Sequence, residues 1–283
     1  MLRLQAVVRS AFALALMLGA PTLANPALGN AVYAQGGVQG VSDAGAQPAS
    51  DQTKRATNSP VLTVPFGVGE RMDYDVRFLG GKKGEGSMEV REITDVRGRK
   101  AWHTVFKVAG RVLLLGVNIT LESWFDVSTL NSLRFFQDQR YTGTKKVQHI
   151  DIFPERGMYK EDALEERVTV SNPLDDGSFL YFVRSVPLEV GQKYSFQRYY
   201  KPDKNPVKIE VIRRETVTTS AGTFRTLVLR PEIKAGGLFA EGKSQVWITD
   251  DSARMVVKLE SELPVGTLSL WLTKFRLGKP HKP

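Results

Sequence analysis

The chain has 283 residues, with 39 lysines and arginines against 30 aspartates and glutamates, and it contains no cysteine. The missing thiol excludes disulfide frameworks, cysteine zinc sites, iron-sulfur clusters, a thiol nucleophile and a lipidated N-terminal cysteine. A formal net charge of +9 and a hydrophobic fraction of 42% are typical of a basic globular protein and exclude a disordered or fibrous chain.

Residues 1–34 have the pattern of a signal peptide. Arg3 and Arg9 precede a short apolar run over residues 11–20, and this run is too short to span a bilayer. We expect cleavage after Ala34, with residues 22–24 as the alternative site and an uncleaved anchor helix as the alternative structure. No later segment is apolar for long enough to span a membrane. The cleaved protein is therefore expected to be periplasmic and to have no transmembrane anchor, with secretion as the alternative.

The rest of the chain divides into a tether and one domain. Residues 35–60 are rich in Gly, Ala, Ser and Pro without an apolar period, which predicts a disordered tether. Residues 61–283 are expected to form a single β-rich domain. This domain carries 35 basic and 28 acidic side chains, a difference of +7. For an exported protein such a charge favours anionic envelope components as partners over nucleic acid.

From residue 72 onward, apolar and polar side chains alternate. Tyr74, Val76 and Phe78 alternate with charged neighbours, and the glycines of residues 80–86 predict a hairpin turn before the return strand. The two-residue period recurs in later segments: 102–108, 117–125, 133–135, 147–153, 207–211, 246–248 and 268–272. About a dozen strands would curl or split an open sheet. The predicted fold is all-β and mainly antiparallel, with one large, strongly curved sheet or half-barrel; a β-sandwich is the alternative.

One segment breaks this period and predicts a short helix over residues 176–185. Asp175 is placed to act as its structural cap, and Pro187 follows its end. Apolar side chains three and four residues apart share one face of this helix: Phe179, Phe182, Val183 and Val186. We expect the helix to pack on or in the concave side of the sheet.

Two groups of residues are candidate ligand contacts. Ser178, Tyr181 and Arg184 follow one another at a spacing of three and could present a polar triplet to an anionic ligand. The alternative, which we favour for Arg184, is a structural ion pair within the core. Tyr194 and Arg198 belong to an alternating aromatic and cationic segment that could contact lipid, lipopolysaccharide or acidic glycan. An ordinary half-buried strand is the alternative for that segment.

Paired carboxylates offer a different chemistry. Asp175 with Asp176, or Asp250 with Asp251, could supply the acid and base of a glycosidase. A helix cap and a β-turn explain these two pairs better, and residues 161–166 are explained by a solvated turn. We therefore assign no catalytic residue, and we expect no metal and no cofactor.

Four segments resemble the bacterial exported family called domain of unknown function 3108. They are residues 175–184 (DDGSFLYFVR), 190–192 (VGQ), 221–224 (AGTF) and 245–251 (QVWITDD). The similarity extends from about Phe66 to Phe275. It implies an exported envelope protein without an established activity, cofactor or catalytic residue. Trp247, in the last of these segments, joins the candidate ligand contacts.

These observations predict a non-catalytic periplasmic protein that binds or carries a lipid, or another hydrophobic or anionic envelope component, in a concave cavity of the sheet. Two alternatives stay open. One is an enzyme that acts on envelope polysaccharide through paired carboxylates, and the other is an assembly factor that binds envelope proteins through sheet edges.

Overall fold

A computed structural model describes residues 63–112, 115–234, 243–263 and 266–280 of the chain. The predicted signal peptide and tether lie outside the described residues. The elements run in the order β1 (Gly67–Val68), β2 (Arg71–Phe78), β3 (Gly81–Val96), β4 (Arg99–Val112), β5 (Leu115–Asp126), β6 (Ser132–Tyr141), β7 (Thr144–Phe153), η1 (Pro154–Arg156), β8 (Met158–Glu161), β9 (Arg167–Val168), α2 (Phe179–Ser185), β10 (Lys193–Phe196), η2 (Pro202–Lys204), β11 (Val207–Thr219), β12 (Gly222–Glu232), β13 (Ser244–Thr249), β14 (Val256–Leu263), β15 (Gly266–Arg276) and β16 (Lys279–Pro280).

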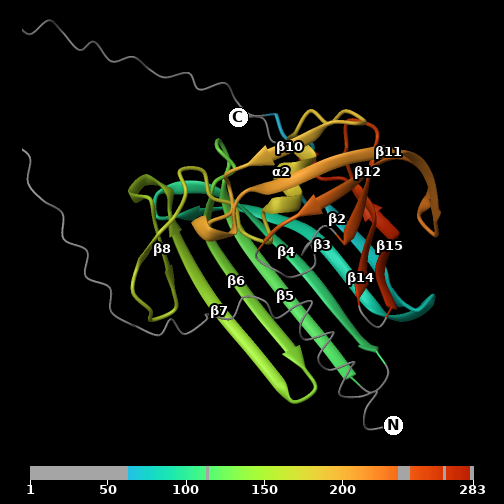
Figure 1. The fold of residues 1–283 in the computed structure, drawn as a ribbon, viewed down its shortest axis with the longest axis horizontal. Coiled ribbons are helices and arrows are strands. Elements are labelled where there is room, and N and C mark those ends of the chain that lie inside the picture. The colour runs from blue at the N-terminus through green and yellow to red at the C-terminus, as the bar shows by residue number, and fades with distance from the viewer. Residues whose placement is uncertain (1–62, 113–114, 235–242, 264–265, 281–283) are drawn as a thin grey trace, which may run out of the picture. The chain divides into compact units, whose positions relative to one another are not determined.

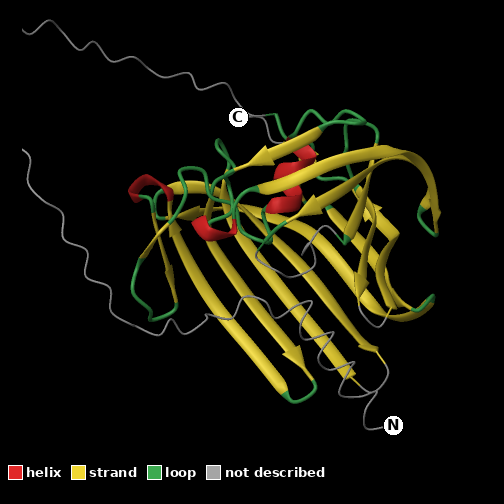
Figure 2. Ribbon diagram, in the orientation of Figure 1, coloured by secondary structure: helices red, strands yellow, loops and turns green. Residues whose placement is uncertain are grey.

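Fourteen of the described strands form one antiparallel sheet, in the order β10-β11-β12-β13-β14-β15-β2-β3-β4-β5-β6-β7-β8-β9. The sheet is strongly curved (Figure 2). It is not closed, because the strand order ends at β10 and β9 and these two strands do not pair. The short strands β1 and β16 pair with each other separately. The predicted all-β curved sheet is confirmed. The β-sandwich alternative is wrong, because neighbouring strands pair continuously from β10 to β9.

The two-residue period gives the sheet an inner and an outer face. The inner face bears Trp102 of β4, Phe125 of β5 and Phe135 of β6, which are at most 1% exposed. The register places further side chains of the same parity in line across the strands. Val108 pairs with Ile119 and Phe106 pairs with Leu121, while the residues between them point outward.

The helix α2 lies against the inner face. The ring centroids of Tyr181 and Phe125 are 5.7 Å apart, and those of Phe182 and Phe196 of β10 are 5.0 Å apart. Figure 1 shows α2 between the β10–β12 strands and the β2–β5 strands. The helix is therefore enclosed by the curving sheet, and side chains around most of its circumference are buried: Phe179, Leu180, Tyr181, Val183 and Arg184.

The helix is shorter than predicted, and it begins at Phe179 instead of Asp176. The Asp175 carboxylate accepts hydrogen bonds from the backbone N–H groups of Gly177 and Ser178 at 2.7 and 2.8 Å. This turn competes with helical hydrogen bonding over the same residues. The buried surface of the helix is also wider than the predicted apolar face, because the charged Arg184 is buried together with the apolar side chains.

The predicted turn over residues 80–86 is only partly correct. The turn consists of Leu79 and Gly80, and Gly84 lies within strand β3. A Cβ at Gly84 would lie 2.2 Å from the carbonyl oxygen of Ala109, and a Cβ at Gly110 would lie 2.5 Å from that of Lys83. Glycine is therefore required here by the close approach of two strand backbones, not by a turn.

Replacement of Gly84 by Ala is expected to lower the free energy of unfolding by about 1–3 kcal/mol, because the new methyl group forces β3 away from β4. Gly116→Ala is the matched control, since the nearest atom to its added Cβ is 3.6 Å away. Urea unfolding followed by circular dichroism measures both variants. Equal stability of the two would contradict the close approach.

Candidate functional site

A buried ion pair holds α2 in place. The Arg184 guanidinium donates to both carboxylate oxygens of Glu70 at 2.7 and 2.8 Å, and the two side chains are 0% and 2% exposed. The same guanidinium donates to the carbonyl oxygens of Ala253 and Pro65, at 3.0 and 3.3 Å. Burial alone would lower the pKa of Arg184, but the nearby Glu70 charge raises it. The arginine is thus charged and joins three segments of the chain.

The other two members of the predicted triplet are also buried. The Ser178 hydroxyl lies 2.9 Å from that of Ser132, and Ser178 is 1% exposed. The Tyr181 hydroxyl is buried without a hydrogen-bond partner, and burial raises its pKa. Because the guanidinium of Arg184 already contacts Glu70, this geometry favours a structural role for the arginine.

Asp175 is a buried hydrogen-bond acceptor at the start of the helix. Its side chain is 0% exposed, and besides the two backbone donors it accepts a 2.7 Å hydrogen bond from the Ser123 hydroxyl of β5. Burial raises the pKa of Asp175 to about 6, although the hydrogen bonds from Ser123 and the Ser178 backbone oppose this shift. The residue thereby fastens the segment before α2 to the inner face.

Tyr194 and Arg198 do not share a strand face, because β10 ends at Phe196. The Tyr194 hydroxyl donates to the carbonyl oxygen of Pro187 at 2.7 Å. Arg198 donates to the Asn131 side chain at 2.9 Å, and its guanidinium carbon lies 4.5 Å from the centre of the Phe182 ring. Burial lowers the pKa of Arg198 to about 10. The two residues therefore lie in different surroundings close to α2.

Trp247 lies on the outer face of the sheet. Its cross-strand partner is Lys258, whose neighbour in turn is Trp271. The Lys258 ammonium lies 4.1 Å from the centre of the Trp247 ring and 4.5 Å from that of Trp271, a cation–π arrangement. The structure does not bring Trp247 together with the candidate residues near α2.

The second carboxylate pair forms a turn. One oxygen of Asp251 accepts hydrogen bonds from Thr249, Ala253 and Arg254, and Asp250 pairs with Arg214 at 2.8 Å. These partners hold both carboxylates in the β13–β14 connection. Among the described residues, no hydrogen bond joins Asp250 or Asp251 to Asp175 or Asp176.

The inner face contains a division that no local period of the sequence reveals. Two adjacent rows of paired residues cross the sheet from β4 to β7. Each row begins with two apolar side chains and ends with two polar ones: Val108-Ile119-Gln139-Lys146 and Phe106-Leu121-Gln137-Gln148. We call the first four the apolar strip (Phe106, Val108, Ile119 and Leu121) and the last four the polar strip (Gln137, Gln139, Lys146 and Gln148).

Hydrogen bonds connect the polar strip. The Gln139 amide donates to the side-chain oxygen of Gln137 at 3.0 Å, and the Gln137 amide donates to that of Gln148. Both Gln137 and Gln139 are less than 10% exposed. Burial lowers the pKa of Lys146, and the charge of Lys201 lowers it further. The result is a polar, partly buried surface beside the apolar strip.

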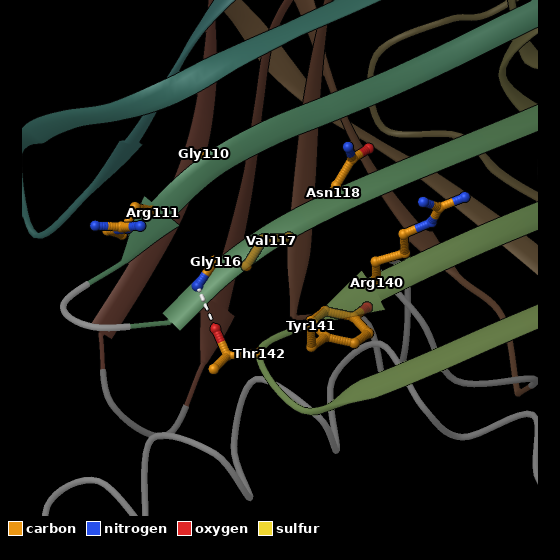
Figure 3. A pocket seen from close by; sticks show the side chains of 8 residues that line it. All are labelled: Gly110, Arg111, Gly116, Val117, Asn118, Arg140, Tyr141 and Thr142. Atoms are coloured by element: carbon orange, nitrogen blue, oxygen red, sulfur yellow. Dashed lines mark hydrogen bonds between the residues drawn. The ribbon is translucent and has the colours of Figure 1, made fainter.

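A shallow pocket of about 320 Å³ lies at the strand ends next to these rows. Gly110, Val117 and Tyr141 line it and form the next row of the inner face. Figure 3 shows Asn118 and Arg140 projecting from one side of the strands and Tyr141 lying on the other. The pocket thus marks the end of the inner face away from α2.

This geometry defines a class of protein: an open, curved antiparallel sheet that encloses a helix and has an inner face divided into apolar and polar parts. The chain belongs to the family described as "Protein of unknown function (DUF3108)", whose model matches residues 73–273. The predicted family resemblance is therefore confirmed.

One solved structure shows the same fold in a distant protein. A β-barrel-like protein of the domain of unknown function DUF1849 from Brucella abortus matches with a TM-score of 0.50 at 10% identity, over 76% of this chain and 99% of that one. A protein with a YmcC-like fold from Bacteroides fragilis NCTC 9343 matches with a TM-score of 0.27 at 13% identity, over the same shares. No curated protein matches. Among the described residues, no helix is long and apolar enough to cross a membrane.

Replacement of Arg184 by Met is expected to lower the free energy of unfolding by about 3–5 kcal/mol, because the Glu70 carboxylate stays buried without its partner. Glu70→Gln should destabilise the protein similarly. The double variant with Met at both positions should regain a large part of the loss, since removal of both charges leaves none unpaired. Urea unfolding measures all three. Single variants within 1 kcal/mol of the parent would contradict this role of the pair.

Stability is expected to fall as the pH rises from about 4 to about 6. The pKa of Asp175 is about 6 in the folded protein against an ordinary value of 3.8, so the folded state binds more protons in this window. The contribution present below pH 4 and lost by pH 6 is on the order of 3 kcal/mol. Asp175→Asn should remove it. Urea unfolding at pH 4 to 7 gives the change in the free energy of unfolding with pH for the parent and the variant. An equal change in both would refute the raised pKa of Asp175.

Proposed function

We propose that this protein is a non-catalytic, exported binder of an amphipathic lipid of the cell envelope. The lipid would lie on the inner face, with its hydrocarbon on the apolar strip and its polar part on the polar strip. The division of the inner face across β4–β7 carries this proposal. An amphipathic ligand matches it, since hydrocarbon gains by leaving water and polar groups need partners.

The position of α2 supports the proposal. Two contacts of the helix and its preceding turn go to residues beyond the strips: Tyr181 to Phe125, and Asp175 to Ser123. A Cβ at Gly177 would lie 2.8 Å from the side chain of Ser123, so the turn packs directly on this part of the sheet. The helix thereby closes one end of the inner face, and the pocket lined by Gly110 and Tyr141 lies at the other.

The dimensions also suit a lipid. Neighbouring strands lie about 4.8 Å apart, so β5 and β7 are separated by about 10 Å. A headgroup on Lys146 of β7 and a chain that begins on Ile119 of β5 would therefore be adjacent parts of one molecule. The basic balance of the chain, 39 cationic against 30 anionic side chains, agrees with an envelope rich in anionic lipids.

The proposal predicts that protein purified from the periplasm without detergent carries lipid, or binds monopalmitoylglycerol when purified free of it. Leu121→Asn should weaken this binding about tenfold by placing an amide in the apolar strip. Thr120→Asn on the opposite face of β5 is the control and should bind as the parent does. Native mass spectrometry and fluorescence titration measure both. A protein that carries no lipid and binds no acyl ligand would overturn the proposal.

A further inference from the structure

We propose that the headgroup of the bound lipid is anionic, a phosphate or a carboxylate, and that Lys146 of the polar strip binds it. This inference rests on the proposed function and adds the ligand class to it. Lys146 belongs to the inner face because it pairs with Gln139, which pairs in turn with Ile119. It is the cation of the two rows, and it ends the row that starts on the apolar side chains of β4 and β5.

Lys146 differs from its basic neighbour in forming no direct ion pair, although the charges of Glu161 and Asp176 act on it. Lys201 forms an ion pair with Glu161 at 2.5 Å, and the Tyr200 hydroxyl donates to the same carboxylate at 3.5 Å. In the part of the chain that the structure describes, Lys146 forms no ion pair and no hydrogen bond with a side chain. These two carboxylates offset part of the cost of its lost hydration, and an anion in direct contact with the ammonium would offset more. A ligand anion would supply that partner.

The amides beside Lys146 complete the recognition. Gln139 and Gln148 flank it across and along the strands, and both belong to the hydrogen-bonded group that Gln137 connects. Side-chain amides donate two hydrogen bonds each, so they can bind headgroup oxygens together with an ammonium. One ammonium beside neutral amide donors fits a headgroup that carries a single negative charge.

Asp176 sets a limit on that charge. Its carboxylate accepts a hydrogen bond from the Tyr199 hydroxyl at 3.2 Å, and it acts electrostatically on Lys146 and Lys201. Burial raises the pKa of Asp176. Because it carries the same sign as the ligand, its charge opposes binding. Removal of that charge should therefore have the opposite effect to removal of Lys146.

The test uses two ligands with the same chain, anionic lysophosphatidylglycerol and neutral monopalmitoylglycerol, on the full mature protein. Lys146→Met should weaken lysophosphatidylglycerol binding about tenfold or more, as expected for loss of a hydrogen bond to a charged group. It should leave monopalmitoylglycerol binding within about twofold. Asp176→Asn should tighten lysophosphatidylglycerol binding and leave the neutral lipid unchanged. Palmitate tests the carboxylate headgroup, and inorganic phosphate tests whether the headgroup binds without its chain.

The outcomes separate the two proposals. If neither lipid binds, the proposed function fails. If both lipids bind and Lys146→Met affects them equally or not at all, lipid binding stands and the anionic headgroup site is wrong. Binding of inorganic phosphate as tight as that of lysophosphatidylglycerol would show an anion site without a lipid, and would overturn the inference. Circular dichroism and the unfolding temperature of each variant confirm that the fold is retained.

Discussion

The arrangement of the domain depends on the buried ion pair between Arg184 and Glu70. Its guanidinium joins α2 to the segment before β2 through Glu70 and Pro65, and to the β13–β14 connection through Ala253. The pair spans 114 positions of the chain. An unpaired charge at this depth is expensive, so the alternative positions of the helix are disfavoured more strongly than apolar packing alone would ensure. The helix is held at one end of the inner face.

The position of α2 determines which part of the inner face the helix covers. The turn before the helix is fastened to Ser123 through Asp175, and the strips lie between this contact and the pocket at the strand ends. Across those strips, the paired side chains are apolar on β4 and β5 and polar on β6 and β7. The proposed function and the choice of headgroup both follow from this change.

The strands, the curved sheet and a helix near residue 180 could be predicted, because each has a local period in the sequence. The polar strip could not. Gln137 and Gln139 alternate with charged outward residues, so β6 is polar on both faces there and its period carries no signal. The partner of Arg184 is distant in the chain, and no local pattern points to Glu70. Gly84 was assigned to a turn because the close approach of β3 and β4 is a tertiary constraint.

Photocrosslinking with a palmitate that carries a diazirine in its chain shows which side chains the bound hydrocarbon contacts. Mass spectrometry of the digested adduct identifies the labelled residues. We predict labels on the inner side chains of β4 and β5, namely Val108, Ile119 and Leu121, which unlabelled lysophosphatidylglycerol suppresses. Labels confined to the outward side chains of the same strands, such as Lys107 and Thr120, would show that the inner face does not bind the lipid.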